Sequence, residues 1–433
     1  MDGGDRLLVL APHPDDEVAG CGGLILRARD LGIPVRIAFL TNGDSNEGAF
    51  LTYRGHPVMA PSAVIAMGRT RETEAERAEG VLGVPASEIS FLGYPDRGTL
   101  SIWLAHWGER PPLRGLLTRA TSVPYAVASR PGAPYKGGAI LADLQRVIAG
   151  LGPTKVCLSS PADRHPDHAA LYLFTRVALW NLGMQPDLLP YLVHYPRWPK
   201  RARRGKVGAI EPPPALQSVL DWRTFRVPLA DREIEHRALL QHRSQMRSVR
   251  RLLDRLVSSD ELFGTLPHLR LDPMAAPGGA LRAVLPFRAE WPRTGPGDLR
   301  LGLSVNGAHL YLEAPAPELH VGRVAIDLIG FSPNRDFAAM PKIEIRVSES
   351  GIEIFDGGVR EARNRGTIAR LGRILRIDLP LSLLGEPDRL LVSARSSAAH
   401  LLIDETPWRV VWLNRTRISP QEARSDSKEA KAK

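Results

Sequence analysis

Apolar residues in the first half of the chain follow two alternating patterns. Short apolar runs, with the length and composition of buried strands, occur at 6–11, 35–41, 88–93 and 155–160. Segments with apolar residues at helical spacing lie between and after them, at 16–31, 69–82, 138–149 and 169–182. Strands that alternate with helices form βαβ units, so we predict an α/β fold with a mostly parallel sheet and flanking helices.

Beyond residue 220 the pattern changes. Residues 224–229 have the composition of one more strand, and the spacing over 231–256 predicts one long amphipathic helix. Pro, Ala and Gly then dominate, after which short alternating runs separated by turn residues predict an all-β, sandwich-like domain. We therefore expect an α/β domain over 1–270, a linker over 271–280, a β domain over 281–416 and a disordered tail over 417–433.

Residues 98–136 interrupt the α/β pattern with a segment rich in Pro, Arg and aromatic residues. A long insertion of this kind is typical of functional loops, and we expect a candidate substrate lid. Its aromatic side chains would either stack on sugar rings or pack the core of the insertion, and packing is the favoured interpretation. These side chains are Trp103, Trp107, Tyr125 and Tyr135.

Composition excludes several classes of protein. The chain has 433 residues, 43% of them apolar, which is too apolar for a disordered protein. No apolar run approaches the ~20 residues of a membrane helix, and the acidic start differs from a signal peptide, so we expect a cytoplasmic protein. The net charge is +10, yet no nucleic-acid-binding motif accompanies it. The basic cluster at 197–206 is interpreted as a solvated loop, the alternative being a contact for an anionic substrate or lipid surface.

Polar clusters follow the predicted strands, where ligands bind in open α/β sheets. The strongest cluster contains His13 and Asp16 directly after the first strand, and a later strand is followed by His168. With only two cysteines present, a metal must be held by histidines and carboxylates. Two histidines and one carboxylate with an open position make a catalytic zinc arrangement, and ferrous iron suits the same ligands.

Two further residues of these clusters are candidates for catalysis. Asp15 adjoins Asp16 without being needed as a ligand, so it is free to take a proton from a metal-bound water. His165 can donate a hydrogen bond or a proton to a developing oxyanion or amine. Together these groups predict an amide hydrolase. In the simpler alternative, the histidines are structural and the aspartates cap the next helix, but two such clusters in one sheet favour the metal.

These motifs, PHPDDE near the start and HPDH later, resemble the PIG-L/LmbE-like family of zinc-dependent N-deacetylases over roughly residues 5–250. The family's T-x-G…G loop resembles Thr41-Asn42-Gly43 with Gly48, and its R-x-x-E…LG helix resembles Arg71, Glu74 and Leu82-Gly83. Its LGY-x-D loop resembles 92–96, and its closing helix resembles HRALLQHRSQ, with His242, Ser244 and Gln245 in place.

The resemblance implies a Rossmann-like fold and removal of an acetyl group from an N-acetylglucosamine unit of a glycan or glycoconjugate. It implies the same ligands, His13, Asp16 and His168, with Asp15 as general base and His165 as oxyanion or acid partner. It further implies substrate binding by Arg71 and Asp96. The alternatives are a surface charge paired with Glu74 for Arg71, and a turn residue for Asp96. His236 stands where the family usually has lysine and is assigned no role.

Other functions remain open at this point. One is an amidase acting on a non-sugar amide, such as a thiol conjugate or an antibiotic precursor, and another is a non-catalytic scaffold of the same fold. Nucleotide binding by Gly20-Cys21-Gly22-Gly23 is disfavoured, because these glycines lack GxGxxG spacing and lie within the first predicted helix. The expected partner is a small-molecule or glycan substrate, with no nucleic acid, and the sequence leaves homo-oligomers open.

Overall fold

The computed structural model describes residues 1–54, 59–199, 209–246, 248, 250–271, 283–286, 300–306, 308–315, 322–348, 351–361, 366–371, 374–398 and 401–414. The predicted disordered tail, most of the predicted linker and most of the basic cluster at 197–206 lie outside these residues.

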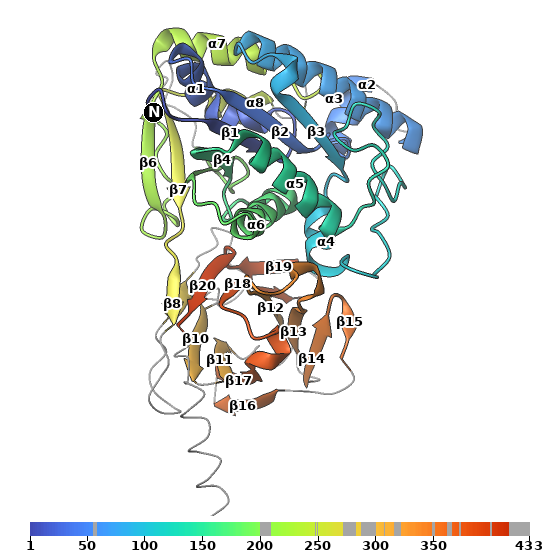
Figure 1. Ribbon diagram of the computed structural model, residues 1–433, viewed down its shortest axis with the longest axis vertical. Helices are drawn as coiled ribbons and strands as arrows, with labels where there is room; N and C mark the ends of the chain where they lie inside the picture. The colour runs from blue at the N-terminus through green and yellow to red at the C-terminus, as the bar shows by residue number, and fades with distance from the viewer. Residues whose placement is uncertain are drawn as a thin grey trace, which may run out of the picture.

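The first region is built on a seven-stranded sheet, in the order β3-β2-β1-β4-β5-β7-β6 (Figure 1). Its strands are β1 (Leu7–Ala11), β2 (Val35–Thr41), β3 (Ile89–Tyr94), β4 (Lys155–Ser159), β5 (Asp187–Tyr191), β6 (Asp221–Arg226) and β7 (Asp260–Thr265). The first five strands of this order are parallel, and β6 and β7 are antiparallel additions at one edge. The predicted α/β fold with a mostly parallel sheet is confirmed.

Helices cover both faces of this sheet. Alternate residues of β1 point to different cores, Leu7 and Val9 to one and Leu8 and Leu10 to the other. The first core is covered by α1 (Asp16–Asp30), α3 (Pro61–Val81), α7 (Leu229–Leu239) and α8 (Arg250–Leu256). The second is covered by α4 (Thr99–Ala105), α5 (Gly137–Leu151) and α6 (Pro166–Asn181). Two short helices, α2 (Glu47–Arg54) and η1 (Ala86–Glu88), complete this region.

The helix predicted over 231–256 is wrong as a single element. The structure has α7 and α8 instead, with turns between them. The break has a long-range cause, because the backbone N–H and the hydroxyl of Ser244 donate to the buried Glu74 carboxylate at 2.8 and 2.6 Å. These two hydrogen bonds draw the chain off the helical path.

The glycines of α1 serve close packing, as the sequence indicates. A Cβ built on Gly20 would lie 2.4 Å from the ring of Tyr191, and one on Gly23 would lie 2.7 Å from Val227. The backbone of Cys21 between them is non-helical, with φ −158° and ψ 29°, so the helix is kinked there. Cys21 and Cys157 are free and buried.

The second region is strand-rich and contains two sheets with one core between them. The smaller sheet has the order β16-β17-β11-β10-β9, and the larger has β15-β14-β13-β12-β18-β20-β8, with β19 paired to β18. The strands are β8 (Leu269–Leu271), β9 (Ala283–Pro286), β10 (Arg300–Asn306), β11 (His309–Pro315), β12 (Gly322–Phe331), β13 (Lys342–Ser348), β14 (Gly351–Asp356), β15 (Val359–Arg360), β16 (Thr367–Leu371), β17 (Ile374–Pro380), β18 (Arg389–Ala398), β19 (Leu401–Glu405) and β20 (Arg409–Leu413). Short 3₁₀ helices are η2 (Phe337–Ala339) and η3 (Leu381–Leu384). The C-terminal β domain is confirmed, although its strand β8 begins before the predicted linker and ends at the linker's first residue.

The two regions are joined by an aromatic cluster. Trp103 in α4 and Trp107 just after it lie with their ring centroids 5.4 and 5.2 Å from that of Phe337 in the β domain. Phe174 of α6 packs on the same two tryptophans, and Trp408 is buried in the same core. The four aromatic side chains of the 98–136 insertion are all buried, so they pack in the core. Among the described helices, none is long and apolar enough to cross a membrane.

Candidate active site

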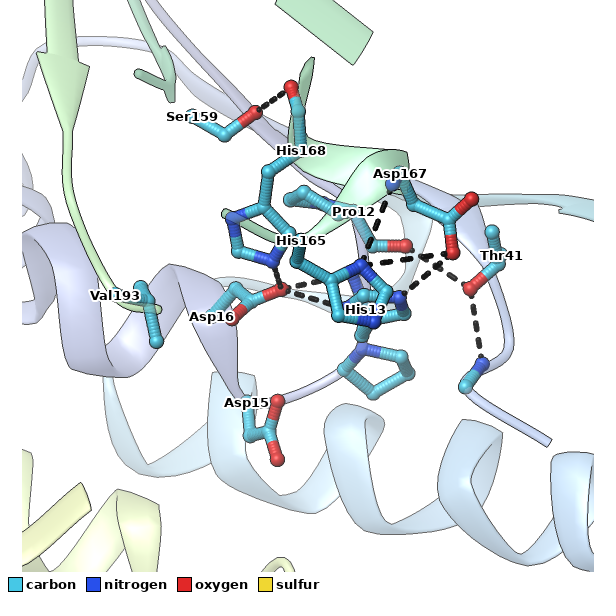
Figure 2. A network of polar contacts seen from close by, with 12 residues as sticks. Pro12, His13, Asp15, Asp16, Thr41, Ser159, His165, Asp167, His168 and Val193 are labelled. Atoms are coloured by element: carbon cyan, nitrogen blue, oxygen red, sulfur yellow. Dashed lines mark hydrogen bonds and ion pairs between the residues drawn. The ribbon is translucent and has the colours of Figure 1, made fainter. Parts of the chain in front are cut away.

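Two loops meet at the carboxyl ends of the neighbouring strands β1 and β4. Asp16 Oδ2 lies 3.0 Å from His13 Nδ1 and 3.1 Å from His168 Nε2 (Figure 2). His13 and Asp16 come from the turn after β1, and His168 stands in the first turn of α6, whose N-cap is His165. The structure therefore brings together the three residues predicted as metal ligands.

The backbone of this turn is strained at Asp15. Its φ of 120° and ψ of −24° are rarely adopted by any residue other than glycine. The conformation is held by the Asp15 N–H, which donates to Glu17 Oε2 at 2.9 Å, and by Arg71 Nη2, which lies 3.3 Å from Asp15 Oδ2. Such strain persists only where the surroundings fix it, and it concentrates at functional sites.

Carboxylates lie next to ring nitrogens of both His168 and His13. His168 Nδ1 lies 3.2 Å from Asp163 Oδ2, which accepts hydrogen bonds from the N–H groups of Val193 and His194 at 2.9 Å each. On the other side, His13 Nε2 lies 3.2 Å from Asp167 Oδ2 and 3.3 Å from Asp96 Oδ1. A histidine that binds metal through one ring nitrogen usually faces a carboxylate or carbonyl with the other.

Three residues of this site were not predicted. Asp163 and Asp167 flank the predicted histidines in the motif DRHPDH, so the signal was present in the sequence. His194 follows β5, a strand that the hydrophobic pattern did not reveal, and its side chain belongs to the same group as His13, Asp16 and His168.

This group fits a divalent metal of the zinc type. Four residues each offer one ligand atom, and these four atoms all lie within 4.8 Å of one another. The residues are His13, Asp16, His168 and His194. His168 is fully buried, and neither ring nitrogen makes a hydrogen bond, although carboxylate oxygens approach both. Tetrahedral zinc, with bonds of about 2.0–2.1 Å, places neighbouring ligand atoms about 3.3 Å apart. The contacts of Asp16 with the two histidines are close to that spacing.

The electrostatics of the site favour a cation. Burial alone would lower the pKa of His168, but Asp16 and Asp163 outweigh it and raise that pKa to about 9. Burial likewise opposes the shift at Asp16, yet His168 and His13 hold the pKa of its carboxyl well below the ordinary value. Positive charge is thus stabilised at the point where the three predicted ligands meet.

Asp15 and His165 have a different environment. Burial raises the pKa of Asp15 to about 6, with Arg71 opposing the shift. Burial and the neighbouring His13 lower the pKa of His165 to about 3. The Nδ1 atom of His165 accepts a hydrogen bond from the Asp167 N–H at 3.3 Å, so the neutral ring carries its proton on Nε2.

The site opens into a pocket of about 240 Å³. Its polar lining comes from His13, Asp15, Asp16, Asn46, Arg71, Asp96, Arg97, His165, His194 and Gln245, and its apolar lining from Val193, Leu252 and Leu253. The 98–136 insertion is fully described and contributes no residue to the lining of this pocket. The aromatic packing described above holds part of it against the β domain.

Arg71 and Asp96 both line the pocket. Arg71 is 3% exposed, and its guanidinium donates to the Gly43 and Pro14 carbonyls beside its contact with Asp15, so the surface pairing with Glu74 is wrong. Asp96 Oδ2 accepts from the Ser45 N–H at 2.8 Å. His236 lies away from the pocket lining, with Nε2 3.4 Å from Asp254 Oδ1.

Residues 8–179 match the PIG-L family model, described as GlcNAc-PI de-N-acetylase. No curated protein matches the sequence. Among solved structures, the conserved protein TT1542 from Thermus thermophilus is 23% identical, with 61% of this chain and 94% of that chain covered and a TM-score of 0.37. N,N'-diacetylchitobiose deacetylase from Pyrococcus horikoshii is 18% identical, with 60% and 82% covered and a TM-score of 0.33. The A40926 pseudoaglycone deacetylase Dbv21 is 19% identical, with 61% and 97% covered and a TM-score of 0.39.

Proposed function

Because residues 8–179 match the PIG-L family model, we propose that the protein is a zinc-dependent N-deacetylase acting on an N-acetylglucosamine-containing glycan or glycoconjugate. The observation that carries this proposal is the convergence of His13, Asp16 and His168 on one point beside an open pocket. Asp15 and His165 line the same pocket, which gives the site an acid–base pair next to the metal ligands.

His13, Asp16 and His168 would hold the metal, with His194 close enough to be a fourth protein neighbour. When bound, zinc lowers the pKa of a water ligand toward about 7 and polarises a carbonyl oxygen. Ferrous iron suits two histidines and a carboxylate as well. Asp163 and Asp167 would keep the imidazole rings turned toward the metal.

Asp15 is the proposed general base. Its carboxylate lines the pocket, is held by Arg71, and is not needed as a ligand. It takes a proton from the attacking water as the oxygen adds to the amide carbon, and it returns a proton to the nitrogen as the C–N bond breaks. Acetic acid and a primary amine are the first products, and transfer of the acid's proton to the amine gives acetate and the ammonium form, so atoms and charge balance without a co-reactant.

His165, Arg71 and Asp96 complete the proposed site. The Nε2–H of neutral His165 donates a hydrogen bond to the carbonyl oxygen as that oxygen gains negative charge. The tautomer supports this role, because Nδ1 already accepts from the backbone of Asp167. Arg71 and Asp96 line the pocket and are proposed to bind the substrate, Arg71 also fixing the base.

The test is the release of primary amine by zinc-loaded protein from two matched panels of acetamides. One panel contains N-acetylglucosamine glycosides and conjugates, and the other contains non-sugar N-acetyl amines. Release from the sugar panel is the expected result. Release confined to the non-sugar panel would contradict the sugar assignment, and a folded protein that binds no zinc would contradict the enzyme assignment.

A further inference from the structure

The β domain contacts the loop that carries His165. Residues 405–408, the last residue of β19 and the turn that leads to β20, lie against 161–164 and Ala169, and the gap between them is only about 20 Å³. Across this contact, Arg164 Nη1 donates to Glu405 Oε2 at 3.2 Å, with side-chain exposures of 17% and 28%. Arg164 is the residue between Asp163 and His165, so the β domain reaches within one residue of the proposed catalytic histidine.

Glu405 stands on a firmly held strand end. In the β18–β19 pairing it lies opposite Arg395, whose guanidinium is bound by Asp327 at 2.7 Å and by Glu344 at 2.5 Å. Thr406 continues the pairing, because its N–H donates to the Ala394 carbonyl and its hydroxyl accepts from the Ala394 N–H, both at 2.8 Å. These contacts fix the backbone at Glu405, and so fix the point from which its side chain reaches Arg164.

The same edge of the β domain is docked on the α/β region. Figure 1 shows β19, β18 and β12 on the side of the β domain that faces α6 and α4. Trp408 is 3% exposed and belongs to the core that α4 and α6 share with the β domain. Because this core is continuous, the β domain cannot move relative to α6 without losing buried aromatic contacts.

On the loop side, the contacts of His165 come from its near neighbours. Its ring accepts a hydrogen bond from the Asp167 N–H at 3.3 Å and lies against the rings of His13, His168 and His194, with centroids 4.6, 5.3 and 5.3 Å away. Its backbone N–H donates to Asp163 Oδ1 at 2.9 Å. The Arg164 N–H donates to the His194 carbonyl at 2.9 Å, which fixes one end of the loop. The Arg164 side chain is not among the pocket lining, so it acts on the chemistry only through its neighbours.

We infer that Glu405 is a positioning residue of the proposed active site, which it serves by holding Arg164 and so fixing His165. The inference rests on the proposed function. It makes the C-terminal β domain a part of the catalytic unit, with its role in turnover rather than in holding a separate ligand.

The test compares Glu405→Ala and Glu405→Gln with wild type as zinc-loaded enzymes. Since small displacements of a catalytic group cost about 10–100-fold in rate, Glu405→Ala is expected to lose about tenfold in kcat. KM and zinc content should stay unchanged, because the proposed ligands and the pocket lining keep their own contacts. Glu405→Gln keeps an acceptor oxygen and should lose less. The reversed pair Arg164→Glu with Glu405→Arg should recover part of the loss from either single reversal.

The matched control is Arg110→Gln. Arg110 Nη2 also bridges the two regions, donating to the Asp356 carbonyl at 3.3 Å, but it is outside the pocket lining and the 405–408 contact. Its kcat should equal that of wild type. A general loosening of the two regions would instead lower kcat in both variants, which would overturn the inference.

A second readout does not need turnover. The ring resonances of His165 in zinc-loaded protein should shift in Glu405→Ala and stay in place in Arg110→Gln. An unshifted His165 ring, or a Glu405→Ala variant that folds and keeps full kcat, would overturn the inference while leaving the deacetylase proposal intact. If wild type released no amine from any acetamide, the proposed function would fail, and the His165 resonances would still decide the positioning role.

Discussion

Replacing Asp163 by asparagine should weaken metal binding more than it weakens the fold. The side chain is fully buried, with Oδ2 3.2 Å from His168 Nδ1 and accepting from two backbone N–H groups at 2.9 Å. Its other oxygen accepts from the His165 N–H at 2.9 Å. Asparagine has the same shape but only one acceptor oxygen and no charge, so one of these groups must lose its partner.

The magnitude follows from these contacts. Loss of the carboxylate behind a metal-binding histidine typically weakens the metal about 10–100-fold, which is about 1.4–2.7 kcal/mol. The buried donor left without an acceptor costs about 1–3 kcal/mol of folding stability. The first quantity is measured by competition with a chromophoric zinc chelator, and the second by denaturant unfolding of the metal-free protein.

The control is Asp187→Asn, which removes a carboxylate that pairs with Arg223 at the far edge of the sheet and is 40% exposed. It should leave zinc affinity unchanged, since exposed ion pairs contribute about 0–1 kcal/mol. A folded Asp163→Asn protein that binds zinc as tightly as wild type would show that His168 is oriented without its carboxylate, contrary to this prediction.

Two further predictions concern stability. Gly20→Ala should destabilise the protein by about 1–3 kcal/mol in urea unfolding, because the new Cβ would lie 2.4 Å from the Tyr191 ring. The control Gly138→Ala should not destabilise it, because nothing lies within 4 Å of the new Cβ. Equal free energies of unfolding for the two variants would contradict close packing at Gly20. Burial lowers the pKa of Lys342 from 10.5 to about 7. Between these values the unfolded chain binds more protons than the folded one, so this lysine makes stability rise with pH from about 7 toward 10.5. Lys342→Met should flatten that rise in urea midpoints measured at pH 7 and 9, and an unchanged slope would show that the lysine is charged in the fold.

The sequence predicts the proposed ligands because each of them follows an apolar run that is easily recognised as a buried strand. His13 and Asp16 follow a recognisable apolar strand within a short turn, and His168 follows another. Parallel neighbouring strands bring such turns together without any knowledge of packing. His194 was not predicted because the strand before it was not recognised. That strand, DLLPY, contains a proline and begins with an aspartate, so it lacks the apolar run that marks the other strands.

What the sequence does not reveal depends on contacts between distant residues. The helical periodicity continues through 240–249, and only the bonds of Ser244 with Glu74 show why the helix breaks. Trp103 and Trp107 suit a lid as well as a core until Phe337 of the β domain is placed against them. Arg71 has the pattern of an exposed helical charge, and its burial against Asp15 emerges only in the fold.

The most direct measurement is amine release from an N-acetylglucosamine substrate by zinc-loaded Asp15→Asn beside wild type, with bound zinc determined in the same samples. Both proteins should bind zinc, and the variant should lose about 10²–10⁴-fold in kcat, the usual contribution of a general base. An Asp15→Asn protein that binds zinc and turns over like wild type would contradict the assignment of Asp15 as the base.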